Sequence, residues 1–240
     1  MLLRYLSALM LMFSPFSGVQ KHAVPHAQTE LHGVDVSHYQ FDIDWGMVAE
    51  MNPVDFAFVK ATEGHDYIDT FFCQNWEDLK QFGIRRGAYH FFRAYGCGEE
   101  QAANFLSLVD MHPGDLAPVL DIERIDGVEP EIMLEEARIW LNRIEETLHI
   151  KPIIYTNQYF YDRYLAGQFN DYPLWIAKYS EDKPFLSDGE TWDFWQYSCK
   201  GCVDGISQKV DLNIFPGTKE MLETLCWYPE TTQESVTARP

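Results

Sequence analysis

Basic residues are scarce in this chain of 240 residues. It has 18 Lys and Arg against 37 Asp and Glu, which gives a formal net charge of −19. Proteins that bind nucleic acid neutralise phosphates with clusters of Lys and Arg, and the sequence contains no such cluster. The composition therefore excludes a nucleic-acid partner and favours a large uncharged substrate.

Motifs that bind cofactors or metals are also missing. The chain has neither a GxGxxG nor a GxxxxGKS/T pattern, so we expect no nucleotide cofactor. Cys199 and Cys202 form a CxxC pair, but no second CxxC answers it, which argues against a zinc site. The total of five cysteines allows disulfides in an exported protein and leaves one thiol unpaired. We therefore expect no metal and no cofactor.

The apolar stretch near the N-terminus is too short to span a membrane. It covers residues 5–13 after Arg4, whereas a membrane helix needs roughly 20 residues. A basic residue before a short apolar stretch is typical of a secretory signal peptide, although an uncleaved anchor or a buried helix would give the same pattern. We expect a secreted or periplasmic monomer without a stable membrane partner.

The rest of the chain has no internal repeat and no low-complexity linker. We therefore expect one catalytic domain over residues 31–228. Residues 1–30 are interpreted as the signal peptide and a spacer. Residues 229–240 are polar and aperiodic, which predicts a disordered tail.

Short runs of β-branched and aromatic residues alternate with helix-like segments. Such alternation predicts parallel βα units, and little room for a helix is left between the last three runs. We predict an α/β fold, an irregular TIM-like (β/α) barrel with about five regular βα units closed by helix-poor strands. The expected strands are 32–37, 55–62, 85–92, 117–123, 151–156, 173–179, 192–198 and 209–215, and the expected helices are 69–83, 99–110 and 130–149.

Two carboxylates follow one of these strands, in the stretch APVLDIER of residues 117–124. Residues at i and i+2 of a strand point to the same face, so Asp121 and Glu123 are expected to face the barrel mouth together. Burial and mutual repulsion would let one of them hold a proton near neutral pH, as glycoside hydrolysis requires. A salt bridge to Arg124 or a solvated strand end would explain the pattern equally well.

Other polar and aromatic residues lie near the ends of the expected strands. Asp35 and Asp211 sit inside apolar runs of the first and last strands, which are neighbours in a closed barrel. Hydrogen bonds to nearby backbone or Tyr groups are the alternative explanation for both. His38, His65 and His90 are interpreted as polar core or rim residues. Sugar rings stack on aromatic surfaces, so Tyr39, Tyr89, Tyr155 and Trp175 are candidate substrate-binding residues. Lys178 and Gln196, which lie near strand ends, complete this set.

Eight motifs in this order resemble the family 25 glycoside hydrolases, the muramidase-type lysozymes. They are HGVDVSHYQFDIDW, FVKATEG, RGAYHFFR, APVLDIE, PIIYTN, PLWIAKY, WQYS and VDLNIF, and the resemblance covers about residues 32–216. It implies an irregular β/α barrel and cleavage of the β-1,4 bond between N-acetylmuramic acid and N-acetylglucosamine in peptidoglycan. Phe41 departs from the pattern, because relatives often have Gly after HYQ, and the cysteine-bearing loop CKGCVDG is not part of it.

The resemblance also implies roles for the acids. Glu123 matches the general acid, and Asp121 matches its partner, which is either the nucleophile or the group that orients the substrate's acetamide. Asp35 and Asp211 match the remaining two acids of the site. Two other hypotheses stay open at this point: a carbohydrate-binding barrel that lacks turnover, and a metal-dependent phosphoesterase, whose barrels also gather acids at strand ends.

Overall fold

The computed structural model describes residues 30–52 and 54–229. All nine strands in these residues form one sheet, which closes because β1 pairs with β2 as well as with β9. The expected leader (1–30) and tail (229–240) lie almost entirely outside the described residues, and both stay predictions. The strands are β1 (Leu31–Val36), β2 (Phe56–Glu63), β3 (Tyr67–Ile68), β4 (Arg85–Phe91), β5 (Val119–Asp121), β6 (Ile153–Asn157), β7 (Leu174–Ala177), β8 (Phe194–Gly201) and β9 (Val210–Phe215).

The closed sheet confirms the predicted irregular barrel. Strands β1, β2 and β4 to β8 pair in parallel around the ring, whereas β9 pairs antiparallel with both β8 and β1. Each of the eight expected runs contains one barrel strand. The two-residue β3, which hydrogen-bonds to the end of β2, was not predicted.

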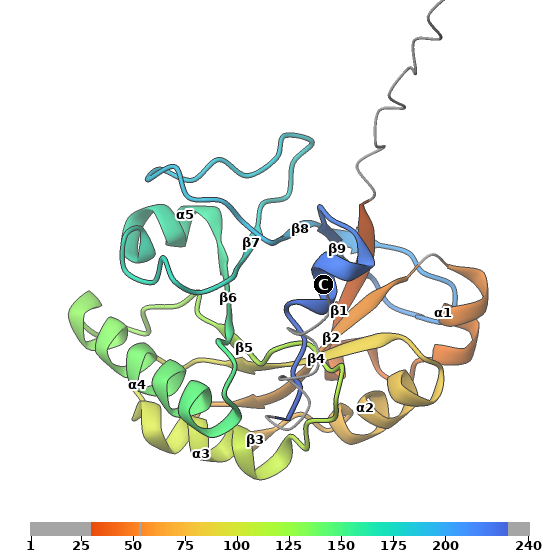
Figure 1. Cartoon of the computed structure of the whole chain (residues 1–240), viewed down its shortest axis with the longest axis horizontal. Coiled ribbons are helices and arrows are strands. Elements are labelled where there is room, and N and C mark those ends of the chain that lie inside the picture. Colours follow the sequence, from red (N-terminus) through yellow and green to blue (C-terminus); the bar gives the residue numbers. More distant parts are fainter. Residues whose placement is uncertain (1–29, 53, 230–240) are drawn as a thin grey trace, which may run out of the picture.

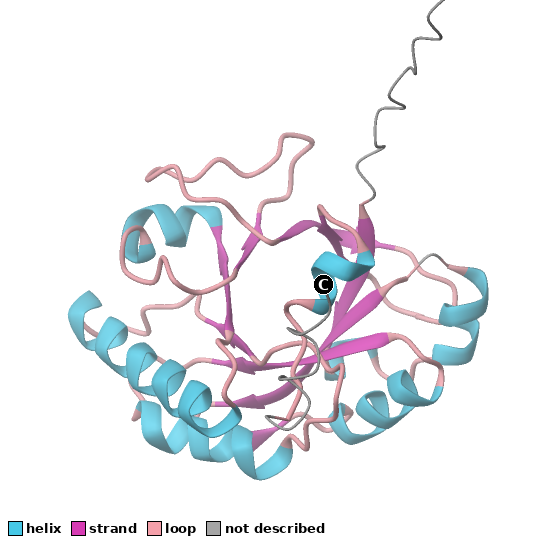
Figure 2. Cartoon of the chain, in the orientation of Figure 1, coloured by secondary structure: helices cyan, strands magenta, loops and turns pink. Residues whose placement is uncertain are grey.

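Helices cover only part of the barrel. Figure 1 shows α2, α3 and α4 along the outside of the strands, with α3 beside α4, whereas loops surround β7 and β8 (Figure 2). Segment 69–83 contains α2, and the other two expected helices match α3 and α4 closely; α1, α5 and α6 were not predicted. The helices are α1 (Trp45–Met51), α2 (Phe72–Gln81), α3 (Gly98–Leu108), α4 (Pro130–Leu148), α5 (Gln158–Phe160), which continues into a π-helical turn (Tyr161–Leu165), and α6 (Lys219–Glu223).

The sequence of α4 shows why it packs against the barrel. Pro130 occupies the first turn, where a missing N–H costs nothing, and His149 ends the helix in a left-handed conformation. Ala137, Leu141 and Ile144 recur every three to four residues and are fully buried. This face packs into the apolar layer between helices and strands.

Aromatic side chains fill the lower interior of the barrel. Phe56 and Phe58 alternate along β2 with residues that face the helices, and the ring of Phe58 stacks on Trp175 with centroids 4.5 Å apart. Gly33 and Gly87 make room for them, because a Cβ at either position would lie within 2.5 Å of a Phe ring carbon. These rings fill the interior below the carboxyl ends of the strands, which is the end where barrels of this class carry their active sites.

Candidate active site

The four predicted acids line one cleft at the carboxyl ends of the strands. Asp35 and Asp211 are directly opposite one another on β1 and β9, while Asp121 ends β5 and Glu123 follows it. The first and last strands do meet, as the barrel prediction required. The cleft encloses about 250 Å³, which is less than the roughly 300–1,000 Å³ of pockets that engulf a drug-sized ligand.

Two amide side chains hold Asp35 in place. Asn213 Nδ2 and Gln196 Nε2 each donate to Asp35 Oδ2 over 2.8 Å. Burial, followed by repulsion from Asp211, nevertheless raises the pKa of Asp35 to about 8. Burial and the charge of Glu123 raise the pKa of Asp211 to about 6. The pair therefore retains at least one proton near neutral pH, and this proton belongs to the pair rather than to either residue.

Asp121 and Glu123 face the same cleft from the end of β5. Burial, followed by repulsion from Glu123, raises the pKa of Asp121 well above its ordinary range. Burial also raises the pKa of Glu123, against the opposing charges of Arg124 and Lys60. The Oδ1 atom of Asp121 is buried, and no group among the described residues hydrogen-bonds to it. Because an unpaired buried oxygen is costly, this atom is suited to bind a donor on a ligand.

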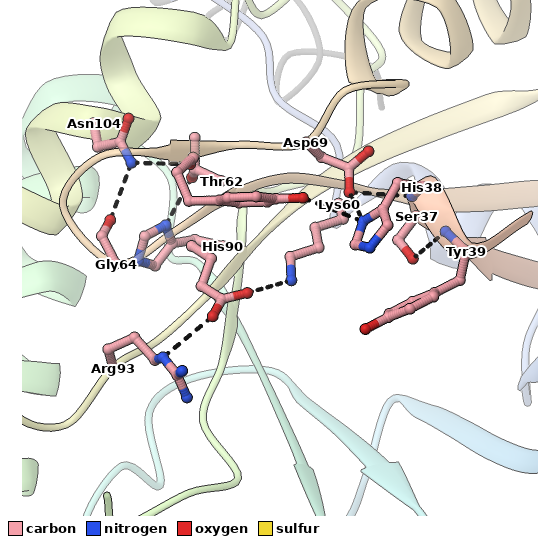
Figure 3. Close-up of polar contacts among 12 residues, drawn as sticks. Ser37, His38, Tyr39, Lys60, Thr62, Gly64, Asp69, His90, Arg93 and Asn104 are labelled. Carbon is pink, nitrogen blue, oxygen red and sulfur yellow. Dashed lines mark hydrogen bonds and ion pairs between the residues drawn. The ribbon is translucent and has the colours of Figure 1, made fainter. Parts of the chain in front are cut away.

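A β-bulge brings Lys60, a cation that lines this cleft, into position. Lys60 pairs with Tyr89 of β4 and Thr62 with His90, so β2 carries one extra residue between them. The bulge lets Lys60 and Glu63 face the same side, with Lys60 Nζ 2.6 Å from Glu63 Oε2. Figure 3 shows Lys60 reaching away from the strand beside Thr62 and His90. The positive charge of Lys60 lowers the pKa values of both Asp121 and Glu123.

Most of the predicted substrate-binding residues also line the cleft, namely Tyr39, Tyr89, Tyr155, Trp175 and Gln196. Tyr39 is 70% exposed, whereas Trp175 is only 2% exposed and donates through Nε1 to Asn213 Oδ1. Lys178 is not among the residues that line the cleft, and its Nζ donates to the Lys183 carbonyl.

The amide of Gln196 connects two of the tyrosines to the acids. Its Oε1 accepts from the hydroxyls of Tyr155 and Tyr179 over 2.9 and 2.8 Å, while its Nε2 binds Asp35. A hydrogen-bonded network of this kind fixes both the orientation of the amide and the position of the carboxylate.

Histidines lie outside the group of acids, as the sequence suggested. His90 is buried, bonds to Thr62 and Gln101, and burial lowers its pKa to about 3, so it stays neutral. His38 lies at the rim and bonds to Asp69, whereas the His65 side chain is 57% exposed.

Neither a disulfide nor a metal site forms in the part of the chain that the structure describes. All five cysteines are free thiols, of which only Cys226 is buried. Residues 30–52 and 54–229 contain no group of three or more His, Cys, Asp or Glu arranged to hold a metal ion.

Several residues that line the cleft or bond to its acids were missed in the sequence. Lys60 had a visible signal, since a lysine inside the apolar run FAFVKAT is buried only when it is paired. Asn213 had a weaker one, because it lies two residues after Asp211 on the same strand. Ser37 and Gln40 had none, because the turn after β1 determines that they line the cleft.

Comparison with known proteins gives the family. Residues 34–206 match Glycosyl hydrolases family 25. Protein YegX of Escherichia coli (strain K12) is 42% identical over 204 residues, 83% of this chain and 74% of YegX. Lysozyme M1 of Streptomyces globisporus is 33% identical over 225 residues, 87% of this chain and 76% of that lysozyme. The structure of a family 25 glycosyl hydrolase from Bacillus anthracis matches with a TM-score of 0.76 and 35% identity, over 81% of this chain and 92% of that one. The chain therefore belongs to glycosyl hydrolase family 25.

Proposed function

We propose that this protein is a muramidase that cleaves the β-1,4 bond between N-acetylmuramic acid and N-acetylglucosamine in peptidoglycan. The observation that carries this proposal is the convergence of four carboxylates from three strands in one cleft, each with a raised pKa. Family membership and the similarity to Lysozyme M1 support the same reaction.

Glu123 acts as the general acid. The bond to the leaving sugar breaks more easily when its oxygen is protonated, so the acid must still hold a proton when the substrate binds. Burial raises the pKa of Glu123 above its ordinary value, while Arg124 and Lys60 limit this rise. The balance of these effects provides a carboxyl that can both donate its proton and recover one from water.

Asp121 acts on the sugar whose anomeric carbon develops positive charge as the leaving sugar departs. When the proton that Asp121 and Glu123 share lies on Glu123, Asp121 is ionised. Its unpaired Oδ1 can then accept the N–H of the substrate's acetamide and turn the acetamide oxygen toward the anomeric carbon, or it can attack that carbon itself. Removal of the acetyl group distinguishes these routes. Cleavage of N-deacetylated glycan would require direct attack by Asp121, whereas loss of cleavage would indicate the acetamide route.

Asp35 and Asp211 place further negative charge beside the same cleft. A carboxylate pair that shares a proton still presents net negative charge, which stabilises the cationic transition state. The aromatic side chains of Tyr89 and Tyr155 face the space where the sugar would lie and offer surfaces for its apolar C–H groups. Trp175 lies at the bottom of the cleft, where its Nε1 donates a hydrogen bond to Asn213 Oδ1 and so fixes the orientation of that amide.

The two other hypotheses are not favoured. A barrel that only binds sugar would have no need for four acids in one cleft, two of them buried, whose raised pKa values indicate that their burial is costly. A metal-dependent phosphoesterase would need a set of metal ligands, and the described residues contain none.

The site of action follows from the substrate, because peptidoglycan lies outside the cytoplasmic membrane. The N-terminal apolar stretch supports export as a secreted or periplasmic protein, and residues 1–29, which contain it, lie outside the described part. Within the described residues, no helix has the length and apolarity needed to cross a bilayer.

Product analysis tests the proposed bond. Purified peptidoglycan is digested, the new reducing ends are reduced with borohydride, and the fragments are identified by mass spectrometry. Muramidase activity places the reduced end on muramic acid. A reduced end on glucosamine would mean that the protein cleaves the other glycosidic bond.

A further inference from the structure

Phe41, at the end of the turn after β1, has a backbone conformation that bulky residues avoid. Its φ and ψ are 56° and −145°. His149 also has a positive φ, but its ψ of 34° lies in the left-handed helical region that many residues visit at helix ends. The Phe41 conformation belongs to the region that glycine occupies almost exclusively, because a Cβ is strained there.

The surrounding hydrogen bonds force this conformation on Phe41. The buried carboxylate of Asp69 binds both the backbone N–H of His38, over 3.1 Å, and its Nδ1, over 2.7 Å, as Figure 3 shows. Ser37 and Gln40 bond reciprocally, and Gln40 Nε2 donates to the Lys209 carbonyl over 3.0 Å. The turn is therefore held from both sides, and the strain at its last residue cannot relax without breaking it.

Burial of the Phe41 ring does not offset this strain, because the residue is 56% exposed. An exposed aromatic side chain on a strained backbone stabilises the fold less than glycine would at the same position. Strain of this kind persists where a side chain serves a ligand. The question is then which ligand reaches this turn.

The same turn lines the catalytic cleft through Tyr39 and Gln40, the two residues before Phe41. Tyr39 is 70% exposed, so its ring belongs to both the cleft and the outer surface, and it packs against His38 with ring centroids 4.2 Å apart. Tyr67 of β3 is 38% exposed, and its ring centroid lies 6.2 Å from that of His38. The cleft thus continues outward as an aromatic rim.

A glycan strand is longer than the enclosed part of the cleft, so its further sugars lie outside this enclosed part. We propose that Phe41 is a substrate-binding residue that stacks on a pyranose ring of the same glycan strand, outside the cleft and beyond Tyr39. Pyranose rings present neutral C–H faces, and these suit an aromatic surface on a protein that carries a net charge of −19. This inference rests on the proposed muramidase function, and it assigns a specificity for long glycan strands.

Two variants at this position separate strain from binding. Phe41→Gly removes both the ring and the strain, whereas Phe41→Ala removes the ring but keeps a Cβ. Both should raise the KM for polymeric peptidoglycan about three- to tenfold, with little change in kcat. Turnover of a short soluble tetrasaccharide should change less than twofold. The thermal midpoint of Phe41→Gly should exceed that of Phe41→Ala by at least about 2 °C. Ile132→Ala, at a half-exposed position on α4, is the control and should alter neither the KM for polymeric peptidoglycan nor the turnover of the tetrasaccharide.

Binding to insoluble peptidoglycan keeps this test independent of turnover. It is measured by sedimentation for Glu123→Gln alone and for the double variant that also carries Phe41→Gly. The double variant should bind about three- to tenfold more weakly than Glu123→Gln. Equal binding, an unchanged KM, or equal loss on polymer and tetrasaccharide would overturn the role of Phe41. Equal thermal midpoints of the Gly and Ala variants would overturn the strain. If wild type bound peptidoglycan but released no reducing ends, the proposed function would fail while the Phe41 assignment could still hold.

Discussion

Replacement of Asp35 by Asn should make the fold more stable at alkaline pH. In the folded protein, burial and repulsion from Asp211 raise the pKa of Asp35 from 3.8 to about 8. The folded state therefore holds this proton more tightly than the unfolded state, and stability is lost as the pH rises from about 4 to about 8. An Asn side chain can still accept from Asn213 and Gln196, so the variant keeps both hydrogen bonds and avoids the loss.

The magnitude follows from the pKa difference. Each pKa unit corresponds to about 1.4 kcal/mol, so a change from 3.8 to about 8 is worth at most about 6 kcal/mol. This is an upper limit, because Asp35 and Asp211 share the repulsion. Urea unfolding of wild type and Asp35→Asn at about pH 4.5 and pH 8.5 measures the effect. The variant should gain several kcal/mol over wild type between these two pH values.

An exposed aspartate provides the matched control. The side chain of Asp66 is 78% exposed, so Asp66→Asn should leave the pH dependence of unfolding unchanged. A difference between wild type and Asp35→Asn that stays constant with pH, or a variant less stable at high pH, would refute the account of this site. Above about pH 8, where Asp35 is ionised, the same substitution also removes a negative charge from the cleft.

Three further perturbations test other parts of the structure. Lys60→Met should lower kcat/KM and move the alkaline limb of its pH profile to higher pH, because Lys60 lowers the pKa values of Asp121 and Glu123. Lys60→Arg should retain more activity, and an alkaline limb that stays at the same pH in Lys60→Met would exclude this role. His90→Gln should reduce the loss of stability below about pH 6.5, because the pKa of His90 is about 3 in the folded state and wild type takes up a proton there on unfolding. If urea unfolding showed the same loss of stability at acid pH in wild type and variant, this account would be contradicted. Reducing-end release should be the same with and without EDTA, whereas inhibition that a divalent metal reverses would point to metal-dependent hydrolysis.

The strand pattern and the ordered motifs were sufficient to predict the barrel. Every expected run contains a strand because alternation and β-branched residues are local properties of the sequence. The helix α1 was missed because it is only seven residues long, and α6 because it has five. Short helices of this kind depend on packing rather than on their own periodicity.

The site was predicted less completely than the fold. The four acids could be found because carboxylates within apolar runs are conspicuous. The contribution of Lys60 could not be assigned, because it depends on the bulge in β2, and a bulge is set by the pairing of two strands. The placement of Lys178 away from the cleft depends in a similar way on the loop that supplies its carbonyl partner. Backbone geometry between distant segments is what the sequence alone does not specify.

The catalytic role of Glu123 is the central claim, and one measurement tests it most directly. Release of reducing ends from purified peptidoglycan is compared for wild type and Glu123→Gln, after circular dichroism and thermal unfolding have shown that both are folded. A positioned general acid typically contributes about 10²- to 10⁴-fold, so the variant should lose at least about 10²-fold in rate. A folded Glu123→Gln protein with a rate within about tenfold of wild type would contradict the claim.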